Sequence, residues 1–469
     1  METLQRTANR GSVSTKYDVD NSVKLDRLNA EKLQFTFDQA ATNLKKNTLS
    51  IWFKRNVIGV NQGLYQFGDD ASGEHTYIRF TSSDDKGFLR GNFGSNVQFL
   101  LTTQSFRDTS AWYHLVVAWD TTQSTASDRL KVYLNGSEIT AFDTDNRSSV
   151  IPLNHDTPNG ENGKSVIIGE GVYDISAYIA ETNFVDGQAL APTSFGEFDS
   201  GSGIWKPKEY TGTYGNNGFY LDFKNSSNLG EDQSGNNHDF TLNNITAADQ
   251  STDTCTNNFC TLNPLVNFKY TTNEITEGAT EFGDDTGGGV GGAFGTFAVT
   301  KGKWYWEVKL TQQNSHYIGV SAVDDGDNVF ASTDPQDENS SFVFNIAVAR
   351  IEYVNSGTKS YGSADAFTDF HSAGDIIGIA LNMDDNQISI YGNGTLQSGV
   401  ANSSIYDAAN KMVVPFHGTI NDECQYNFGG YSAWTPASAA SDANGYGTFE
   451  YAPPSGYYAL CTKNLAEYG

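Results

Sequence analysis

Long apolar runs are missing from this sequence of 469 residues, and no stretch approaches the roughly 18 apolar residues that a membrane-spanning helix needs. An apolar segment is also missing from the N-terminal sequence METLQRTANRGSVSTKYDVDNSVKLD, although a secretory signal peptide requires one. We therefore expect synthesis in the cytoplasm, with neither membrane insertion nor signal-dependent export.

Basic residues are scarce. Lys and Arg number 29 against 56 Asp and Glu, which gives a formal net charge of -27 at pH 7. Binding to nucleic acid or to an anionic membrane surface depends on clustered Lys and Arg. The charge therefore predicts no nucleic-acid partner and no membrane attachment. It favours solubility, notably in salty water, where ions screen the self-repulsion of the chain.

Cysteines are few, and they lie at Cys255, Cys260, Cys424 and Cys461. The spacing in DTCTNNFC does not fit a zinc-ligand pair well, and a second pair is absent. Four cysteines allow three disulfide pairings. Because cytoplasmic synthesis keeps thiols reduced, we expect buried or free thiols.

Sequence signatures of catalysis are missing as well. A glycoside hydrolase needs two carboxylates flanking the scissile bond at about 5 to 10 Å, yet no E-x-D-x-x-E spacing occurs. Neither a G-x-S-x-G motif nor an H-x-x-x-H pair is present. The Asp-Asp pairs all lie beside Gly, Ser or Asn, as in solvated turns: Asp69-Asp70, Asp84-Asp85, Asp284-Asp285, Asp324-Asp325 and Asp384-Asp385. The sequence therefore predicts that the protein is not an enzyme.

Patterns typical of β-strands dominate what is present. The chain has 47 Gly, 24 Tyr and 29 Phe, a composition that favours an all-β protein with many tight turns. In TLSIWFKRN the residues Leu49, Ile51 and Phe53 fall on one face of a strand. The segment RLKVYLNG alternates in the same way and ends in Asn135-Gly136, a strong hairpin signal. No helix of ordinary length is indicated.

These patterns divide the chain into four segments. Residues 1–32 are polar and without periodicity, so we expect an N-terminal arm. Residues 33–190 and 264–469 each carry a series of strands. Residues 191–263 are rich in Gly, Asn, Asp and Ser, but they hold too many aromatic residues for a solvated spacer. We expect this segment to be an ordered connector that packs on one or both flanking domains. Its aromatic residues are Trp205, Tyr210, Tyr214, Phe219, Tyr220 and Phe223.

Both strand-rich segments resemble known families. The first resembles the laminin-G/concanavalin-like sandwich in TLSIWFKRN, AWYHLVVAWD, LKVYLNGSEI and YIAETNFVDGQALAPTSFGEFD. The second resembles the SPRY (B30.2) sandwich in GKWYWEVKL, YIGVS, GDIIGIALNMDDNQISIYGNG, VVPFHG, QYNFGG and YAPPSGYYAL. The resemblance implies an all-β protein of two antiparallel β-sandwiches, a jelly roll followed by a SPRY-like domain, joined by the connector.

The segments that join the domains are similar to virion proteins of tailed phages that infect marine bacteria. This likeness is carried by NRGSVSTKYDVDNSVKL, FVDGQAL, GIWKPKEYTGTYGNNGFYLDF and TNNFCTLNPL. In such proteins the modules lie on tail fibres or other exposed appendages. The resemblance implies a protein of the virion surface, made in the host cytoplasm, whose arm attaches it to other virion proteins or to its own copies.

We therefore expect a virion appendage protein that binds host-surface glycans or proteins non-covalently through the rim loops of its sandwiches. A homo-oligomer is expected, because repeated weak sites gain avidity. One alternative is a structural protein that decorates the capsid or bridges tail proteins without a host ligand. A further alternative is a glycan depolymerase.

Candidate ligand-binding residues are aromatic side chains in or near loops of the second domain. Aromatic rings stack on sugar faces, with neighbouring Asn and Asp as hydrogen-bond partners. We single out Tyr317, Tyr361, Tyr431 and Trp434. By contrast Trp112, Trp119, Trp304 and Trp306 are expected to be core residues, as aromatic residues of a strand usually are.

No cofactor is predicted except calcium. Laminin-G-like sandwiches often bind Ca²⁺ at the rim through Asp side chains and backbone carbonyls, and oxygen ligands suit this ion. The candidate ligands are Asp69, Asp70 and Asp120 in the first domain and Asp324, Asp325 and Asp327 in the second. The Gly-rich segment GDDTGGGVGGAFG lacks the following Lys and helix of a phosphate-binding loop, so we expect a flexible rim loop there.

Overall fold

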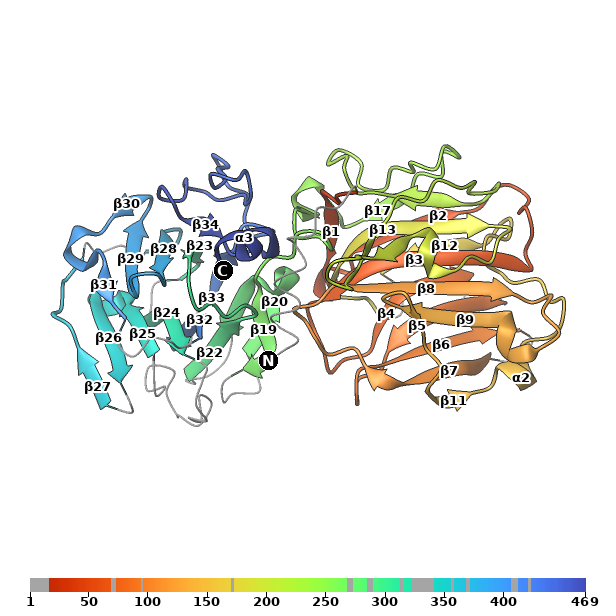
Figure 1. The fold of residues 1–469 in the computed structure, drawn as a ribbon, viewed down its shortest axis with the longest axis horizontal. Coiled ribbons are helices and arrows are strands. Elements are labelled where there is room, and N and C mark those ends of the chain that lie inside the picture. The colour runs from red at the N-terminus through yellow and green to blue at the C-terminus, as the bar shows by residue number, and fades with distance from the viewer. Residues whose placement is uncertain are drawn as a thin grey trace. The chain divides into compact units, whose positions relative to one another are not determined.

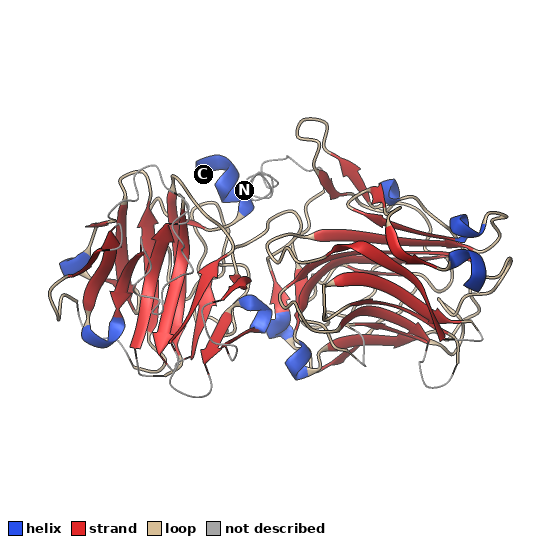
Figure 2. Ribbon diagram, turned by 90° about the horizontal axis from the view of Figure 1, so that it is seen from below, coloured by secondary structure: helices blue, strands red, loops and turns tan. Residues whose placement is uncertain are grey.

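The computed structural model of the protein describes residues 17–68, 73–93, 96–169, 173–267, 273–284, 290–312, 315–322, 341–355, 358–367, 372–405, 412–420 and 423–469. Contacts divide the chain into two compact units, with the division between Thr256 and Asn257. Strands dominate both units, and the helices are short (Figure 1, Figure 2). The all-β prediction is confirmed.

The first unit contains two eight-stranded antiparallel sheets. One has the order β10-β9-β8-β3-β13-β1-β18, with β16 paired to β13. The other has the order β11-β7-β6-β5-β4-β12-β2-β17. The strands of the first sheet are β1 (Ser22–Leu25), β3 (Lys46–Arg55), β8 (Tyr113–Asp120), β9 (Leu130–Leu134), β10 (Ser137–Glu138), β13 (Ala177–Asp186), β16 (Phe219–Leu221) and β18 (Gln250–Ser251). Those of the second are β2 (Lys32–Thr36), β4 (Gln62–Gly68), β5 (His75–Phe80), β6 (Lys86–Asn92), β7 (Asn96–Ser105), β11 (Phe142–Asp145), β12 (Ser165–Ile168) and β17 (Thr241–Asn243).

One apolar core lies between these two sheets. Leu49, Ile51 and Phe53 of β3 all belong to it, which confirms the predicted alternation. The turn between β9 and β10 is also as expected, because Asn135 and Gly136 both take positive φ angles, of 46° and 82°. That conformation is the one that a two-residue hairpin turn of type I′ requires.

The opposite face of β3 and β8 is covered by the segment that was predicted as a connector. A small hairpin of β14 (Gly196–Phe198) and β15 (Trp205–Pro207) places the Trp205 ring against this face. The ring packs so closely that a Cβ added at Gly136 or Gly196 would lie 2.3 or 2.4 Å from it. Glycine at these two positions therefore makes room for the indole.

These contacts correct the predicted domain boundaries. The connector is ordered, but its residues up to Thr256 belong to the first unit, because β16, β17 and β18 pair with β13, β2 and β1. The described part of the predicted arm, 17–32, likewise belongs to this sandwich through β1. Residues 1–16 of the arm lie outside the described residues. Short strands of two to four residues carry too little pattern to be found by periodicity, which is why the boundaries at 33, 190 and 264 differ.

The second unit also contains two sheets. A seven-stranded sheet has the order β19-β22-β32-β24-β25-β26-β27, and a nine-stranded sheet has the order β20-β21-β33-β23-β28-β29-β30, with β31 on β29 and β34 on β23. The strands of the seven-stranded sheet are β19 (Leu262–Asn267), β22 (Val290–Gly295), β24 (Ser315–Ala322), β25 (Ser341–Asn345), β26 (Arg350–Asn355), β27 (Thr358–Tyr361) and β32 (Val413–Ile420). Those of the nine-stranded sheet are β20 (Asn273–Thr276), β21 (Glu281–Asp284), β23 (Lys303–Leu310), β28 (Ile376–Asn382), β29 (Gln387–Gly392), β30 (Thr395–Leu396), β31 (Ser403–Ser404), β33 (Glu423–Asn427) and β34 (Tyr458–Ala459).

Strand β23 illustrates why this unit buries the residues that it does. Trp304, Trp306, Val308 and Leu310 all enter the core between the two sheets, as the alternation predicts. Tyr305 points to the other face, where the C-terminal segment packs on it through Phe449. The strand is thus covered on both sides, which explains why Tyr305 and Glu307 are buried as well as the four core residues.

Helical segments are short. The α-helices of the described residues are α2 (Arg147–Val150) and α3 (Thr462–Tyr468). The 3₁₀ turns are η2 (Arg27–Asn29), η3 (Ala126–Arg129), η4 (Pro192–Ser194), η5 (Ala247–Asp249), η6 (Glu277–Ala279), η8 (Ile346–Val348) and η9 (Ser398–Val400). None of the helices in the described part of the chain has the length and apolar character that a membrane-spanning helix needs.

All four cysteines are described, and no disulfide joins them.

Candidate binding site

The structure separates the four aromatic residues that were predicted to bind a ligand. Tyr361 lies at the edge of the seven-stranded sheet and is 53% exposed. Tyr431 and Trp434 follow β33 in the sequence. Tyr317 is buried on the outer face of β24, packed with Phe294 and Phe416. Tyr317 is therefore a packing residue, and the prediction that it lines a rim site is wrong.

The surroundings of Tyr361 are fixed by a charged group on the neighbouring strands. Glu352 of β26 is buried, and its Oε1 accepts hydrogen bonds from Arg350 Nε at 2.8 Å, Arg350 Nη2 at 2.6 Å and Asn345 Nδ2 at 2.7 Å. Charge-assisted bonds of this kind hold a guanidinium in one orientation. Arg350 is thereby immobilised on β26, the strand next to the edge strand β27.

The guanidinium of Arg350 in turn lies over the ring of Tyr361, 4.4 Å from its centroid. A cation over an aromatic face is attractive and restricts the ring. The β26–β27 pairing, in which Glu352 stands opposite Tyr361, places the side chains of Arg350 and Tyr361 on the same face of the sheet. The result is an exposed aromatic surface, held in place, beside a charged group that can donate hydrogen bonds to a ligand.

Tyr431 and Trp434 are both more enclosed than Tyr361. The Tyr431 hydroxyl donates to Glu277 Oε2 at 3.2 Å, and Lys309 Nζ lies 5.7 Å from the centroid of the Trp434 ring. Trp434 is buried, and its Nε1 has no hydrogen-bond partner among the described residues. The indole of Trp434 is therefore covered, whereas the ring of Tyr361 is exposed.

The Asp120 carboxylate makes several contacts within the protein. Its carboxylate accepts hydrogen bonds from Thr122 and Gln123 and forms an ion pair with Lys46 Nζ at 3.2 Å. Hydrogen bonds to the charged form lower the pKa of Asp120, against the opposing effect of burial. These contacts stabilise the turn that follows β8. The other predicted calcium ligands, Asp69, Asp70, Asp324, Asp325 and Asp327, lie outside the described residues.

One buried carboxyl group was not anticipated from the sequence. Glu181 of β13 accepts hydrogen bonds from the hydroxyl groups of Tyr17, at 2.6 Å, and Tyr220, at 2.9 Å. It takes a positive φ of 46° where the register of β13 shifts against β3. Burial raises the pKa of Glu181 to about 7, although the two tyrosine hydroxyls oppose this rise. Through these hydrogen bonds Glu181 holds Tyr17, near the N-terminus, and Tyr220, in the segment predicted as a connector, at the first sheet.

Two family models match the chain. Residues 29–188 match the model described as the Concanavalin A-like lectin/glucanases superfamily, and residues 303–431 match the model described as the SPRY domain. A laminin-G/concanavalin-like domain is therefore followed by a SPRY domain, as the sequence patterns predicted. No match to the chain is found among the curated proteins.

The chain is also similar to several solved structures, among them the following three. The SPRY domain of human HERC1 is 17% identical, covering 35% of this chain and 96% of that one, with a TM-score of 0.25. Domains LG4-5 of the mouse laminin alpha1 chain are 10% identical, covering 96% and 89%, with a TM-score of 0.30. A putative carbohydrate binding protein from Bacteroides ovatus is 14% identical, covering 49% and 60%, with a TM-score of 0.33.

Proposed function

We propose that this protein is an exposed component of a tailed-phage virion that binds glycans or proteins of the host surface non-covalently. The binding role is supported by two sandwich domains, of which the first belongs to a superfamily that includes lectins. The phage setting is supported by the sequence likeness of the joining segments to virion proteins. The net charge of -27 argues against nucleic acid as the ligand.

The observation that carries the proposal is the immobilised Tyr361 ring. An apolar sugar face stacks on an exposed aromatic ring, and neighbouring polar groups bind the hydroxyl groups. Among the described residues no partner of Arg350 Nη1 is found, whereas Nε and Nη2 are held by Glu352. Arg350 therefore orients the ring and offers a donor to a hydroxyl group beside it. Each such site binds weakly, and repeated copies in a homo-oligomer supply the avidity.

The first experiment locates the protein. Intact particles are labelled with gold-conjugated antibodies raised against residues 17–469. Gold on the tail tip or fibres supports the proposal. Gold spread over the head supports capsid decoration instead, and the absence of label from all particles removes the virion setting.

The second experiment tests the binding site. Tyr361→Ala is compared with Tyr173→Ala, a matched control in the first unit that is 41% exposed and also lies beside an arginine, Arg79, 4.8 Å from its ring. Binding to host cells and to immobilised host surface polysaccharide is measured with monomeric protein. We expect about tenfold weaker binding for Tyr361→Ala and no change for the control. Equal binding by all three proteins would exclude Tyr361 as the platform.

The same preparations distinguish binding from turnover. A binding protein leaves the polysaccharide intact, whereas a depolymerase releases reducing ends over time. We expect no increase in reducing ends with the wild-type protein. A time-dependent increase that scales with protein concentration would replace the binding proposal by the depolymerase alternative.

A further inference from the structure

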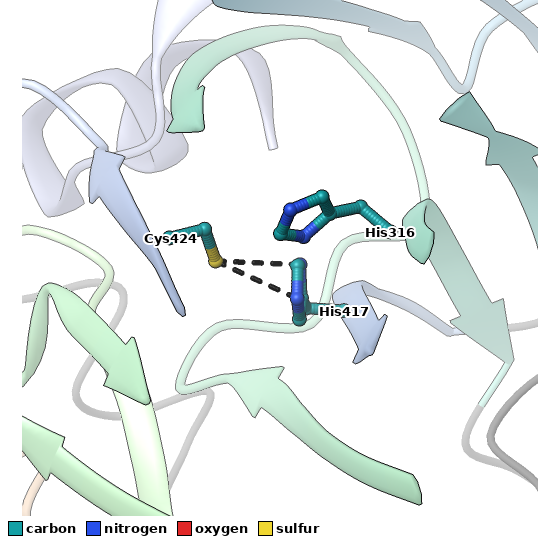
Figure 3. A group of neighbouring side chains, drawn as sticks. All are labelled: His316, His417 and Cys424. Atoms are coloured by element: carbon teal, nitrogen blue, oxygen red, sulfur yellow. Dashed lines mark hydrogen bonds between the residues drawn. The ribbon is translucent and has the colours of Figure 1, made fainter. Parts of the chain in front are cut away.

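Three side chains in the core of the second unit converge on one point between its two sheets. His316 comes from β24 and His417 from β32 of the seven-stranded sheet, and Cys424 comes from β33 of the nine-stranded sheet (Figure 3). All three are fully buried. Their nitrogen and sulfur atoms lie within 4.8 Å of one another. The convergence is a product of the fold, because the three residues share no local spacing motif.

The pairing of the strands explains the geometry. His417 stands opposite Ile318, two residues beyond His316 on β24, so the two imidazoles are diagonal neighbours on the inner face. Their ring centroids are 5.6 Å apart. In the nine-stranded sheet, Cys424 of β33 stands opposite Phe282 of β21 and Leu310 of β23. From there it faces the two histidines across the core.

The distances suit a metal ion. Cys424 Sγ lies 3.5 Å from His417 Nε2 and 3.6 Å from His417 Nδ1. A tetrahedral ion with bonds of about 2.0 Å to nitrogen and 2.3 Å to sulfur holds these two ligand atoms about 3.5 Å apart. The ligand atom of His316 lies within 4.8 Å of those of His417 and Cys424. A small movement of the His316 ring would shorten these distances to about 3.5 Å.

We propose that His316, His417 and Cys424 form a binding site for a thiophilic transition-metal ion, zinc(II) or copper(I). Two imidazoles and one thiolate are ligands of the type that these ions select, while calcium and magnesium prefer oxygen. The site is closed to solvent and joins the two sheets. Its role is therefore to fasten the sandwich rather than to carry out chemistry on a substrate.

A contact between Tyr426 and the ligand His417 also supports this assignment. Its hydroxyl group lies 2.9 Å from His417 Nδ1. Metal-bound histidines usually bind a second group through the ring nitrogen that does not ligate, which fixes the tautomer and the ring orientation. Tyr426 thereby leaves Nε2 of His417 to the metal ion. It lies on β33 two residues after Cys424, so it faces the same side of the sheet.

The proposal is tested first by elemental analysis. The full chain is purified without a polyhistidine tag and without chelators, and bound zinc and copper are measured. We expect about one ion per chain, with the element found identifying the native ion. Cys424→Ser and His417→Gln are expected to bring the content to background. Cys260→Ser is the matched control, since Cys260 is a buried thiol of the same core whose sulfur contacts the Thr296 hydroxyl group and should leave the metal content unchanged.

A second measurement begins with the wild-type protein, so that its main result does not require a variant to fold. Cobalt(II) is titrated into metal-free wild-type protein while thiolate-to-cobalt and ligand-field absorption bands are recorded. Bands typical of cobalt bound by one thiolate and two imidazoles are expected to saturate at about one equivalent. Tyr426→Phe is expected to weaken the affinity by about 10- to 100-fold with the bands retained. Absence of these bands, or metal retained by both Cys424→Ser and His417→Gln, would overturn the proposal.

Discussion

The indole nitrogen of Trp205 donates a hydrogen bond to Nδ1 of His114 at 2.8 Å. An indole can only donate, so His114 accepts at Nδ1 and carries its proton on Nε2, from which it donates to Ser50 Oγ at 2.8 Å. Burial lowers the pKa of His114 to about 3, in keeping with this neutral form. The chain Trp205–His114–Ser50 fastens the β14–β15 hairpin to the outer face of the first sheet.

Trp205→Phe is therefore expected to lower the free energy of unfolding of the first unit by about 1–3 kcal/mol, because the buried Nδ1 of His114 loses its donor. Urea denaturation followed by circular dichroism measures the loss. Phe198→Ala serves as the control, since Phe198 touches the same indole but is exposed, and the expected loss is below about 1 kcal/mol. Equal losses would show that ring packing, not the hydrogen bond, stabilises the hairpin.

Glu181 predicts a pH dependence of stability. Its pKa is raised to about 7 in the folded protein from 4.5, so the folded state binds a proton more tightly than the unfolded state. The resulting stabilisation is fully present below pH 4.5 and is lost as the pH rises through 7. The loss amounts to about 3 kcal/mol at most, from 1.36 kcal/mol for each unit of pKa.

Glu181→Gln is expected to flatten this dependence in the first unit. The measurement is the urea midpoint of each unit between pH 5 and pH 8. Glu307→Gln is the matched variant in the second unit, where burial also raises the pKa of Glu307 to about 7. We expect each substitution to act on the transition of its own unit. An unchanged slope in Glu181→Gln would exclude this carboxyl as the titrating group.

The long strands of the fold were predictable because two-residue alternation is a local signal. Leu49, Ile51 and Phe53 of β3 and the tryptophans of β23 face the core as the sequence indicates. Strands β1, β16 and β18 have two to four residues and are held by distant partners, so periodicity does not reveal them. This is why residues 17–32 and the connector were placed outside the first sandwich.

The sites were less predictable than the strands. Tyr361 is exposed as expected, but Tyr317 on β24 is covered by aromatic residues of β22 and of the adjacent strand β32, a packing that no local pattern encodes. Glu181 and the group of His316, His417 and Cys424 depend on contacts between residues far apart in sequence. Their residue types were visible, but only the pairing of strands brings them together.

The revised boundary predicts how fragments of the chain behave. A fragment of residues 13–256 is expected to fold alone with a single cooperative urea transition, because it retains both sheets and their outer cover. A fragment of residues 33–190 lacks β1, β16 and β18 and exposes the face on which Trp205 packs, so we expect no cooperative transition. Cooperative unfolding of the shorter fragment with the same midpoint would contradict the assignment of residues 191–256 to this unit.

A buried ion pair gives the sharpest test of that assignment. Lys54 Nζ on β3 lies 2.8 Å from Asp253 Oδ2, and both side chains are buried. Asp253 Oδ1 also accepts a hydrogen bond from Trp112 Nε1 at 3.0 Å. Asp253→Ala removes this carboxylate from the buried ammonium group of Lys54 and from the buried indole N–H of Trp112. We therefore expect a loss of about 3–5 kcal/mol in the free energy of unfolding of the first unit.

The matched control is Asp156→Ala. The pair between Lys45 and Asp156 is equally short, at 2.7 Å, but it is exposed, and such pairs contribute at most about 1 kcal/mol. Both variants are compared by urea denaturation at the same pH and ionic strength. Because charge and distance are matched, a difference between them measures the effect of burial. Similar small losses would mean that the segment around Asp253 is not part of the cooperative unit.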